Sequence, residues 1–145
     1  MALWRLYYHI VWATKNRYPY ITVNKESQLY SYIISKSNNL ECIVHAIGGV
    51  ADHLHLVTSI PPKLSIAEFV KIIKGSSSHF YNMELQDEIK FAWQDGYGIF
   101  SLGTKQLDKA VNYVNNQKIH HQNNSTLTLL EKIDHNDDPP IKYFN

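Results

Sequence analysis

The sequence predicts an α+β domain built on an antiparallel sheet, with two helices on one face and a further helix toward the C-terminal end. Short segments rich in aromatic and β-branched residues alternate with segments whose apolar residues recur at helical spacing. Their order is strand, helix, strand, strand, helix, strand, helix. The chain has 145 residues, the size of one domain.

The first half of the chain predicts three strands and one helix. Residues 4–14 are aromatic and β-branched and end at a polar segment, which is typical of a strand. Asn24 is placed to cap a helix that runs to a serine and asparagine break. Two apolar segments, 41–47 and 53–60, flank Gly48-Gly49 and predict a hairpin that turns at these glycines.

The second half predicts two helices and one strand. Ser65 and Glu68 form a capping box before an amphipathic helix, which ends near Gly75 or bends there and continues toward Met83. Residues 99–102 predict the fourth strand. Thr104 then caps a third helix with an apolar stripe.

These elements form a ferredoxin-like or RRM-like layout in which the second face of the sheet is open. We assign residues 1–121 to the domain and residues 122–145 to a weakly ordered C-terminal tail, with one helical turn around residues 127–132.

Composition excludes several classes of protein. Cys42 is the only cysteine, so no intramolecular disulfide forms, which fits the reducing cytoplasm. No apolar run reaches membrane-spanning length, and the aromatic start predicts a strand rather than a signal peptide. Lys and Arg number 14 against 13 Asp and Glu, so any nucleic-acid surface must be local. The best basic clusters are residues 15–17 and Lys71 with Lys74.

The segment Asp52-His53-Leu54-His55-Leu56 carries the first functional signal. Because side chains alternate along a strand, His53 and His55 leave the same face about 7 Å apart, close enough to bind one metal ion. Leu54 and Leu56 then face the core. Two imidazoles displayed together predict a metal site. Asp52 is either a turn residue, the reading we favour, or a partner that orients an imidazole.

Tyr113 and Gln117 carry the second signal. They lie four residues apart on the third predicted helix, so their side chains are neighbours. Periodicity by itself favours a packing role for Tyr113. Tyr97, between two glycines, is the rival nucleophile. The remaining candidate histidines are explained by positions in a sheet or helix or near a helix C-terminus, namely His9, His45, His79, His120 and His121.

Five segments, taken together and in order, resemble the single-tyrosine HUH transposases of the insertion-sequence two-hundred-like family: YYHIVWATKNR, GGVADHLHLVTSIPP, FVKIIKGSSSHF, FAWQDGYGIFS and VNYVNNQKIHH. The resemblance extends from about Trp4 to His121. It implies a DNA transposase that cuts and rejoins single-stranded DNA at the ends of a mobile element. The two histidines of the family motif match His53 and His55, the nucleophile matches Tyr113, and the glutamine that completes the metal site matches Gln117.

The resemblance also implies a mechanism, a cofactor and partners. Attack by Tyr113 produces a 5′-phosphotyrosine and a free 3′-OH. Because one phosphodiester replaces another, the bond energy is retained and rejoining needs no nucleotide cofactor. Imidazole ligands alone favour zinc, cobalt or nickel, whereas the family implies magnesium or manganese. The implied partners are single-stranded DNA with hairpin ends and a second copy of the chain, in an isologous homodimer whose third helix completes the partner's site.

Two other classes remain open. An RRM-like module would bind RNA by stacking bases on exposed aromatic residues such as Tyr7. A catalytically inactive or host-adopted relative would bind hairpin DNA without cutting it. Metal-dependent cleavage distinguishes both from a transposase.

Overall fold

The computed structural model describes residues 2–85, 88–123, 126 and 137–141 of the chain. In chain order its helices and strands are β1 (Tyr7–Ala13), α1 (Val23–Asn39), β2 (Ile43–Val50), β3 (His53–Ser59), α2 (Ile66–Phe80), β4 (Gly98–Leu102), α3 (Leu107–Asn115) and α4 (Gln117–Gln122). No described helix is both long and apolar enough to cross a bilayer. The helical turn predicted around residues 127–132 lies outside the described residues.

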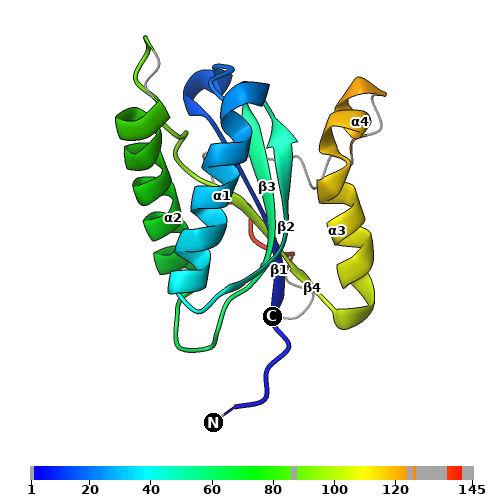
Figure 1. The fold of residues 1–145 in the computed structure, drawn as a ribbon. Helices are drawn as coiled ribbons and strands as arrows, with labels where there is room; N and C mark the ends of the chain where they lie inside the picture. The colour runs from blue at the N-terminus through cyan, green and yellow to red at the C-terminus, as the bar shows by residue number, and fades with distance from the viewer. Residues whose placement is uncertain (1, 86–87, 124–125, 127–136, 142–145) are drawn as a thin grey trace.

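The four strands form one antiparallel sheet in the order β2-β3-β1-β4. Helices α1 and α2 lie on one side of this sheet, and α3 and α4 lie on the other (Figure 1). The strand order and the two helices on one face confirm the predicted ferredoxin-like α+β class. The second face is not open, however, because α3 packs on it.

One predicted helix start and one predicted turn are displaced in the structure. Helix α1 begins after Thr22, whose carbonyl oxygen accepts hydrogen bonds from the first turn, so Asn24 is not its cap. The β2–β3 hairpin is confirmed, but its turn lies at residues 51–52. Gly48 and Gly49 instead pair with His55 and Leu54 inside the sheet. The physical reason for glycine at position 48 is the close approach of α3.

The helix signals were partly correct. The Ser65 hydroxyl accepts a hydrogen bond from the Glu68 amide at 3.1 Å, as the capping box predicts. Helix α2 continues through Gly75 and ends in a π-helical turn, Tyr81–Leu85. Thr104 does not cap α3, because it begins a turn of 3-10 helix that precedes Leu107.

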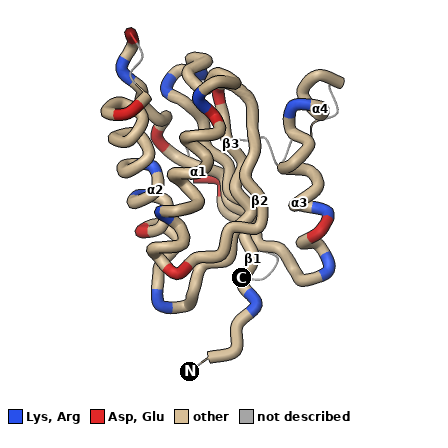
Figure 2. Tube along the Cα trace, viewed as in Figure 1, with Lys and Arg blue, Asp and Glu red and all other residues tan. Residues whose placement is uncertain are grey.

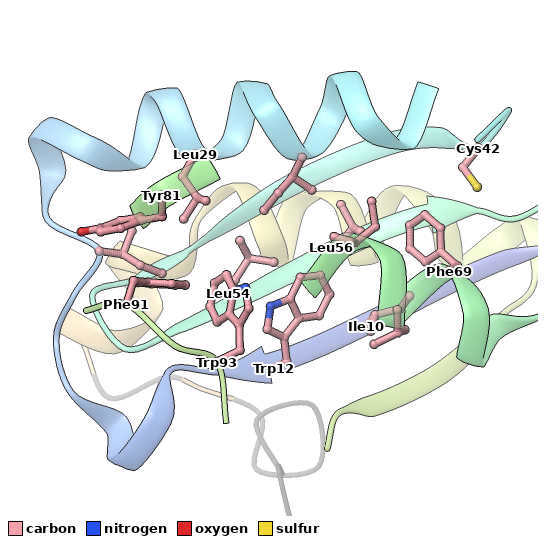
Figure 3. Close-up of a cluster of buried hydrophobic side chains, with 14 of the residues drawn as sticks. Ile10, Trp12, Leu29, Cys42, Leu54, Leu56, Phe69, Tyr81, Phe91 and Trp93 are labelled. Atoms are coloured by element: carbon pink, nitrogen blue, oxygen red, sulfur yellow. The ribbon is translucent and has the colours of Figure 1, made fainter. Parts of the chain in front are cut away.

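The main core lies between the sheet and helices α1 and α2 (Figure 3). Leu54 and Leu56 of β3 face Trp12 and Ile10 of β1, and all four side chains are fully buried. Cys42 belongs to the same core, as predicted, and burial raises the pKa of its thiol to about 11. Consequently the apolar side of β3 is committed to packing, and its other side remains for the histidines.

A second, smaller apolar cluster joins α3 to the opposite face of the sheet. It consists of Ala46, Val57, Ala110, Tyr113 and Val114. Gly48 permits this contact, because a Cβ atom at that position would collide with the carbonyl oxygen of Val114. The sheet face that an RRM-like module would offer to RNA is therefore covered by α3.

Candidate active site

The candidate site lies on the β3 face that α3 and α4 cover. His53 and His55 leave this face together, as predicted, and their ring centroids are 5.2 Å apart. Both rings are buried, with exposed fractions of 3% and 0%. Two adjacent buried imidazoles need partners, because unpaired polar groups in the interior are costly.

His9 of β1 is the partner of His55. Its Nε2 atom lies 2.8 Å from His55 Nδ1, so one ring donates the shared proton to the other. If His55 carries that proton on Nδ1, its Nε2 atom keeps a lone pair for a ligand. His9 was expected to be an ordinary sheet histidine, but the structure makes it a member of the cluster.

Asp52 is the partner of His53, and its carboxylate Oδ1 lies 2.8 Å from His53 Nδ1. Arg17 Nη1 lies 3.3 Å from the same nitrogen, but a guanidinium can only donate. We assign the proton to Nδ1, donated to Asp52, because that contact is shorter and Arg17 also lies 3.7 Å from the Asp52 carboxylate. Asp52 does stand in the turn, yet the less favoured reading, that it orients an imidazole, is correct for its side chain.

This arrangement affects both groups. The hydrogen bond from His53 is the main cause that holds the pKa of Asp52 below its ordinary value, against the opposing effect of partial burial. A proton held on Nδ1 leaves the lone pair of His53 on Nε2. That atom faces α4, where His121 lies.

Gln117 and His121 approach His53 from α4. Gln117 Oε1 lies 3.1 Å from His121 Nε2, which lies 3.1 Å from His53 Nε2. One N–H on His121 cannot serve both neighbours in full, so the three atoms have more lone pairs than protons between them. Neighbouring ligands of an octahedral ion with bonds of 2.0–2.1 Å are also about 3 Å apart. The donor set therefore fits a divalent metal ion.

An amide ligand is essential to this fit. No group of three or more His, Cys, Asp or Glu side chains among the described residues is arranged to hold a metal. Gln117 is 1% exposed, and its Nε2 atom has no hydrogen-bond partner among the described residues. A buried side-chain oxygen that contacts the His121 imidazole, which itself contacts His53, is the feature that a metal would explain.

Tyr113 lies beside the histidines on α3. Its ring centroid is 5.9 Å from that of His55 and 6.2 Å from that of His9, and its ring stacks on His120 at 4.6 Å. The rival, Tyr97, packs against the core on the α1 and α2 side of the sheet. The topology thus brings together Tyr113 and the histidine pair, and separates Tyr97 from them.

The structure changes how Tyr113 and Gln117 are connected. They were expected on one continuous helix, but the chain leaves helical geometry at Asn116, with φ −109° and ψ 23°, and α4 starts at Gln117. Lys118, the next residue, donates hydrogen bonds to Glu26 of α1 and Gly49 of β2. This contact fixes α4 against its own sheet.

Sequence reasoning missed His121 as a site residue and undervalued His9. His121 was attributed to the helix C-terminus, and it does lie in the last turn of α4. A usable signal existed, since Gln117 and His121 are four residues apart and share a helix face. His45 and His79 meet expectation: His45 contacts the Ser59 hydroxyl at 2.8 Å, and His79 is exposed on α2.

The two predicted basic clusters have different roles in the structure. Lys74 donates hydrogen bonds to the carbonyl oxygens of Gln94 and Gly96, so its role is structural. Arg17 lies at the candidate site. Charges of both signs are interspersed over α1, α2 and α3 (Figure 2), in accord with the near-neutral composition.

Comparisons with known proteins identify the family of the chain. The sequence model of the family described as "Transposase IS200 like" matches residues 2–117. The chain is 28% identical over 119 residues to the transposase for insertion sequence element IS200 of Salmonella typhimurium, covering 79% of this chain and 78% of that protein. It is 32% identical over 78 residues to the ISDra2 transposase TnpA of Deinococcus radiodurans, covering 52% and 54%.

A solved structure supports the fold. The REP-associated tyrosine transposase bound to a REP hairpin superposes with a TM-score of 0.63 at 16% identity, covering 83% of this chain and 74% of that one. At this identity the likeness concerns the fold alone.

Proposed function

The chain belongs to the IS200-like transposase family, and on that premise we propose that it cuts and rejoins single-stranded DNA at the ends of a mobile element. The observation that carries the proposal is that Tyr113 lies beside His55, the neighbour of His53, on the buried face of the sheet that α3 and α4 cover. Cleavage of a phosphodiester by this route requires a nucleophile and, beside it, ligands that can bind a metal ion.

The proposed ligands are His53 and His55 through their Nε2 atoms and Gln117 through its Oε1 atom, and His121 holds the Gln117 oxygen beside His53. Magnesium or manganese is the proposed ion. When bound, it would polarise the scissile phosphate and stabilise charge on the leaving 3′ oxygen. Asp52 and His9 orient the two imidazoles, because each contacts an Nδ1 atom and leaves Nε2 to point away.

Tyr113 is the proposed nucleophile. An ordinary phenol, with a pKa near 10, is only about 0.1% ionised at pH 7, so its activation must offset roughly 4 kcal/mol. Attack of its oxygen on phosphorus forms the phosphotyrosine bond and breaks the bond to the 3′ oxygen, which leaves as a 3′-OH. Because one phosphodiester replaces another, rejoining requires no nucleotide cofactor.

The cluster is closed in this structure, since Tyr113 is only 7% exposed and His120 covers its ring. A phosphodiester reaches Tyr113 only if α4 moves away from the sheet. Asn116, outside helical geometry, is the natural point for that motion, and the ion pair of Lys118 with Glu26 opposes it.

Hairpin-ended single-stranded DNA is the proposed partner, and the solved relative bound to a REP hairpin supports this choice. We also propose that the chain acts as an isologous homodimer in the cytoplasm. Mass measurement in solution under active conditions tests the dimer directly, and a monomer would contradict it.

The decisive experiment incubates the protein with labelled single-stranded DNA from its own flanking genome, with and without manganese. We expect cleavage and a covalent adduct on denaturing gels, both dependent on metal and both lost in Tyr113→Phe. Tyr97→Phe is the matched control and should retain the adduct. Hairpin binding without cleavage under manganese would instead identify an inactive relative.

A further inference from the structure

A surface pocket of about 520 Å³ lies beside the turn that follows β1. It is lined by Lys15, Asn16, Tyr18, Tyr20, Lys90 and Ala92. Nothing in the proposed chemistry of the histidine cluster uses this pocket. Its lining comes from two segments distant in sequence, the turn after β1 and the segment before β4.

The lining combines positive charge with an aromatic surface. Lys15 and Lys90 are both exposed, and none of the described lining residues is acidic. Tyr18 is 45% exposed, and its ring centroid lies 4.7 Å from that of the buried Tyr20. An exposed tyrosine beside lysines matches an unpaired nucleotide, whose base stacks on aromatic rings and whose phosphate is attracted by ammonium groups.

The turn that forms the pocket is held in a defined shape. The Lys15 amide donates to the Ala92 carbonyl oxygen at 3.0 Å, and the Asn16 amide donates to Gln94 Oε1 at 2.9 Å. Asn16 and Arg17 both have a φ of 56°, a left-handed conformation that is unfavourable for arginine. These bonds tie the turn to the segment that supplies Lys90 and Ala92.

Arg17 joins the pocket to the candidate active site. Its chain neighbours, Asn16 and Tyr18, line the pocket, while its guanidinium lies 3.3 Å from His53 and 3.7 Å from the Asp52 carboxylate. If one nucleotide of a DNA strand lies in the pocket, a phosphate only a few nucleotides away along that strand therefore lies at the histidine cluster.

We propose that this pocket binds an unpaired nucleotide of the single-stranded DNA substrate, next to the phosphate that is cut. The base packs on Tyr18, and the flanking phosphates contact Lys15 and Lys90. This inference rests on the proposed function, since it names a substrate subsite of the same reaction. It commits to single-stranded DNA, and duplex DNA or an acidic polypeptide is an alternative that the test separates.

The test measures binding of fluorescein-labelled oligothymidylate to the full chain by anisotropy. Tyr18→Ala should weaken binding about tenfold, whereas Tyr18→Phe, which keeps the ring, should bind like the wild type. Lys90→Ala should reduce the slope of log affinity against log salt by about 0.7. Lys105→Ala, an exposed lysine on the turn before α3, is the control and should change neither quantity.

A second readout is photo-cross-linking of an oligonucleotide that carries 5-iodo-deoxyuridine, with the modified residue identified by mass spectrometry. A cross-link at Tyr18 supports the pocket. Equal affinity of wild type and Tyr18→Ala, with cross-links elsewhere, overturns it, as does equally strong competition by duplex DNA or polyglutamate. Thermal unfolding checks that each variant is folded.

These outcomes are distinguishable from failure of the proposed function. If the pocket variants weaken binding but wild-type protein forms no covalent adduct, the pocket stands and the transposase chemistry fails. If the adduct forms at Tyr113 and the pocket variants bind and react as the wild type does, only the pocket proposal fails.

Discussion

The Nε2 atoms of His53 and His121 lie 3.1 Å apart, although the two residues are 68 positions apart in the chain. Two imidazole nitrogens at this distance cannot both present lone pairs, so a proton or a cation must lie between them. Gln117 adds a third polar atom to the same point. His121 thereby holds the Gln117 oxygen beside His53, and its removal gives the first prediction.

We expect His121→Ala to lower the affinity for manganese about tenfold or more, because Gln117 loses the imidazole that positions its side-chain oxygen. Isothermal calorimetry measures the effect. His79→Ala removes an exposed histidine on α2 and should leave the affinity unchanged. Equal binding by the wild type and His121→Ala would remove His121 from the site.

Asp52→Asn should also reduce metal affinity, by about 10-fold to 100-fold, because an amide orients the His53 ring less strongly than a carboxylate does. The Tyr113→Phe change should leave the same affinity intact. Calorimetry on both variants separates orientation of a ligand from the chemistry of the nucleophile. An unchanged affinity in Asp52→Asn would show that the contact with His53 does not position the ring.

The pH dependence of stability provides an independent check on Asp52. A carboxyl group whose pKa is lower in the folded state stabilises the fold above its unfolded pKa, near 3.8, and this stabilisation is lost as the pH falls through the lowered value. Wild type should therefore have a larger free energy of unfolding than Asp52→Asn above about pH 5, by on the order of 0.5 kcal/mol for a partly exposed group, and should lose this advantage at lower pH. Denaturant titrations at several pH values measure it. A difference that does not decrease as the pH falls well below 3.8 would contradict the assignment.

Gly48→Ala should destabilise the fold by about 1–3 kcal/mol, because the added Cβ collides with the backbone of α3 at Val114 and overpacked sites cannot relax freely. Cleavage should fall with it, since Tyr113 precedes Val114. Gly75→Ala is the matched control: a Cβ there meets no atom within 4 Å, and alanine favours the helix by about 1 kcal/mol. Urea unfolding that ranks the two variants in the opposite order would contradict the packing described.

Mixing two inactive variants tests which chain supplies Tyr113. In this structure α3 and α4 pack on their own sheet, so we expect no recovery of cleavage when His53→Ala/His55→Ala protein is mixed with Tyr113→Phe protein. Recovery would mean that the helices are exchanged between protomers, as the resemblance to the family implied. Each variant mixed with wild-type protein serves as the control for subunit exchange.

The face of each residue in β3 was predictable from the sequence, because side-chain alternation is a local property of any strand. Leu54 and Leu56 face the main core, and His53 and His55 face away from it, as the pattern predicts. The Ser65 cap follows from the same kind of local rule. The order of elements was also sufficient for the fold class, since a chain with this alternation of strands and helices has few ways to cover a sheet.

Only the tertiary structure decided what surrounds the two histidines. His9 and His121 come from a strand and a helix far from the histidine pair in the sequence, and no periodicity relates them to it, whereas Asp52 is the neighbour of His53 in the chain. From the sequence Gly48 was interpreted as a turn glycine. Its actual role depends on the position of α3, because a Cβ atom at position 48 would collide with the carbonyl oxygen of Val114, 66 residues later in the chain. Local rules describe which way a side chain points, whereas its partners depend on where other elements pack, and packing is a property of the whole chain.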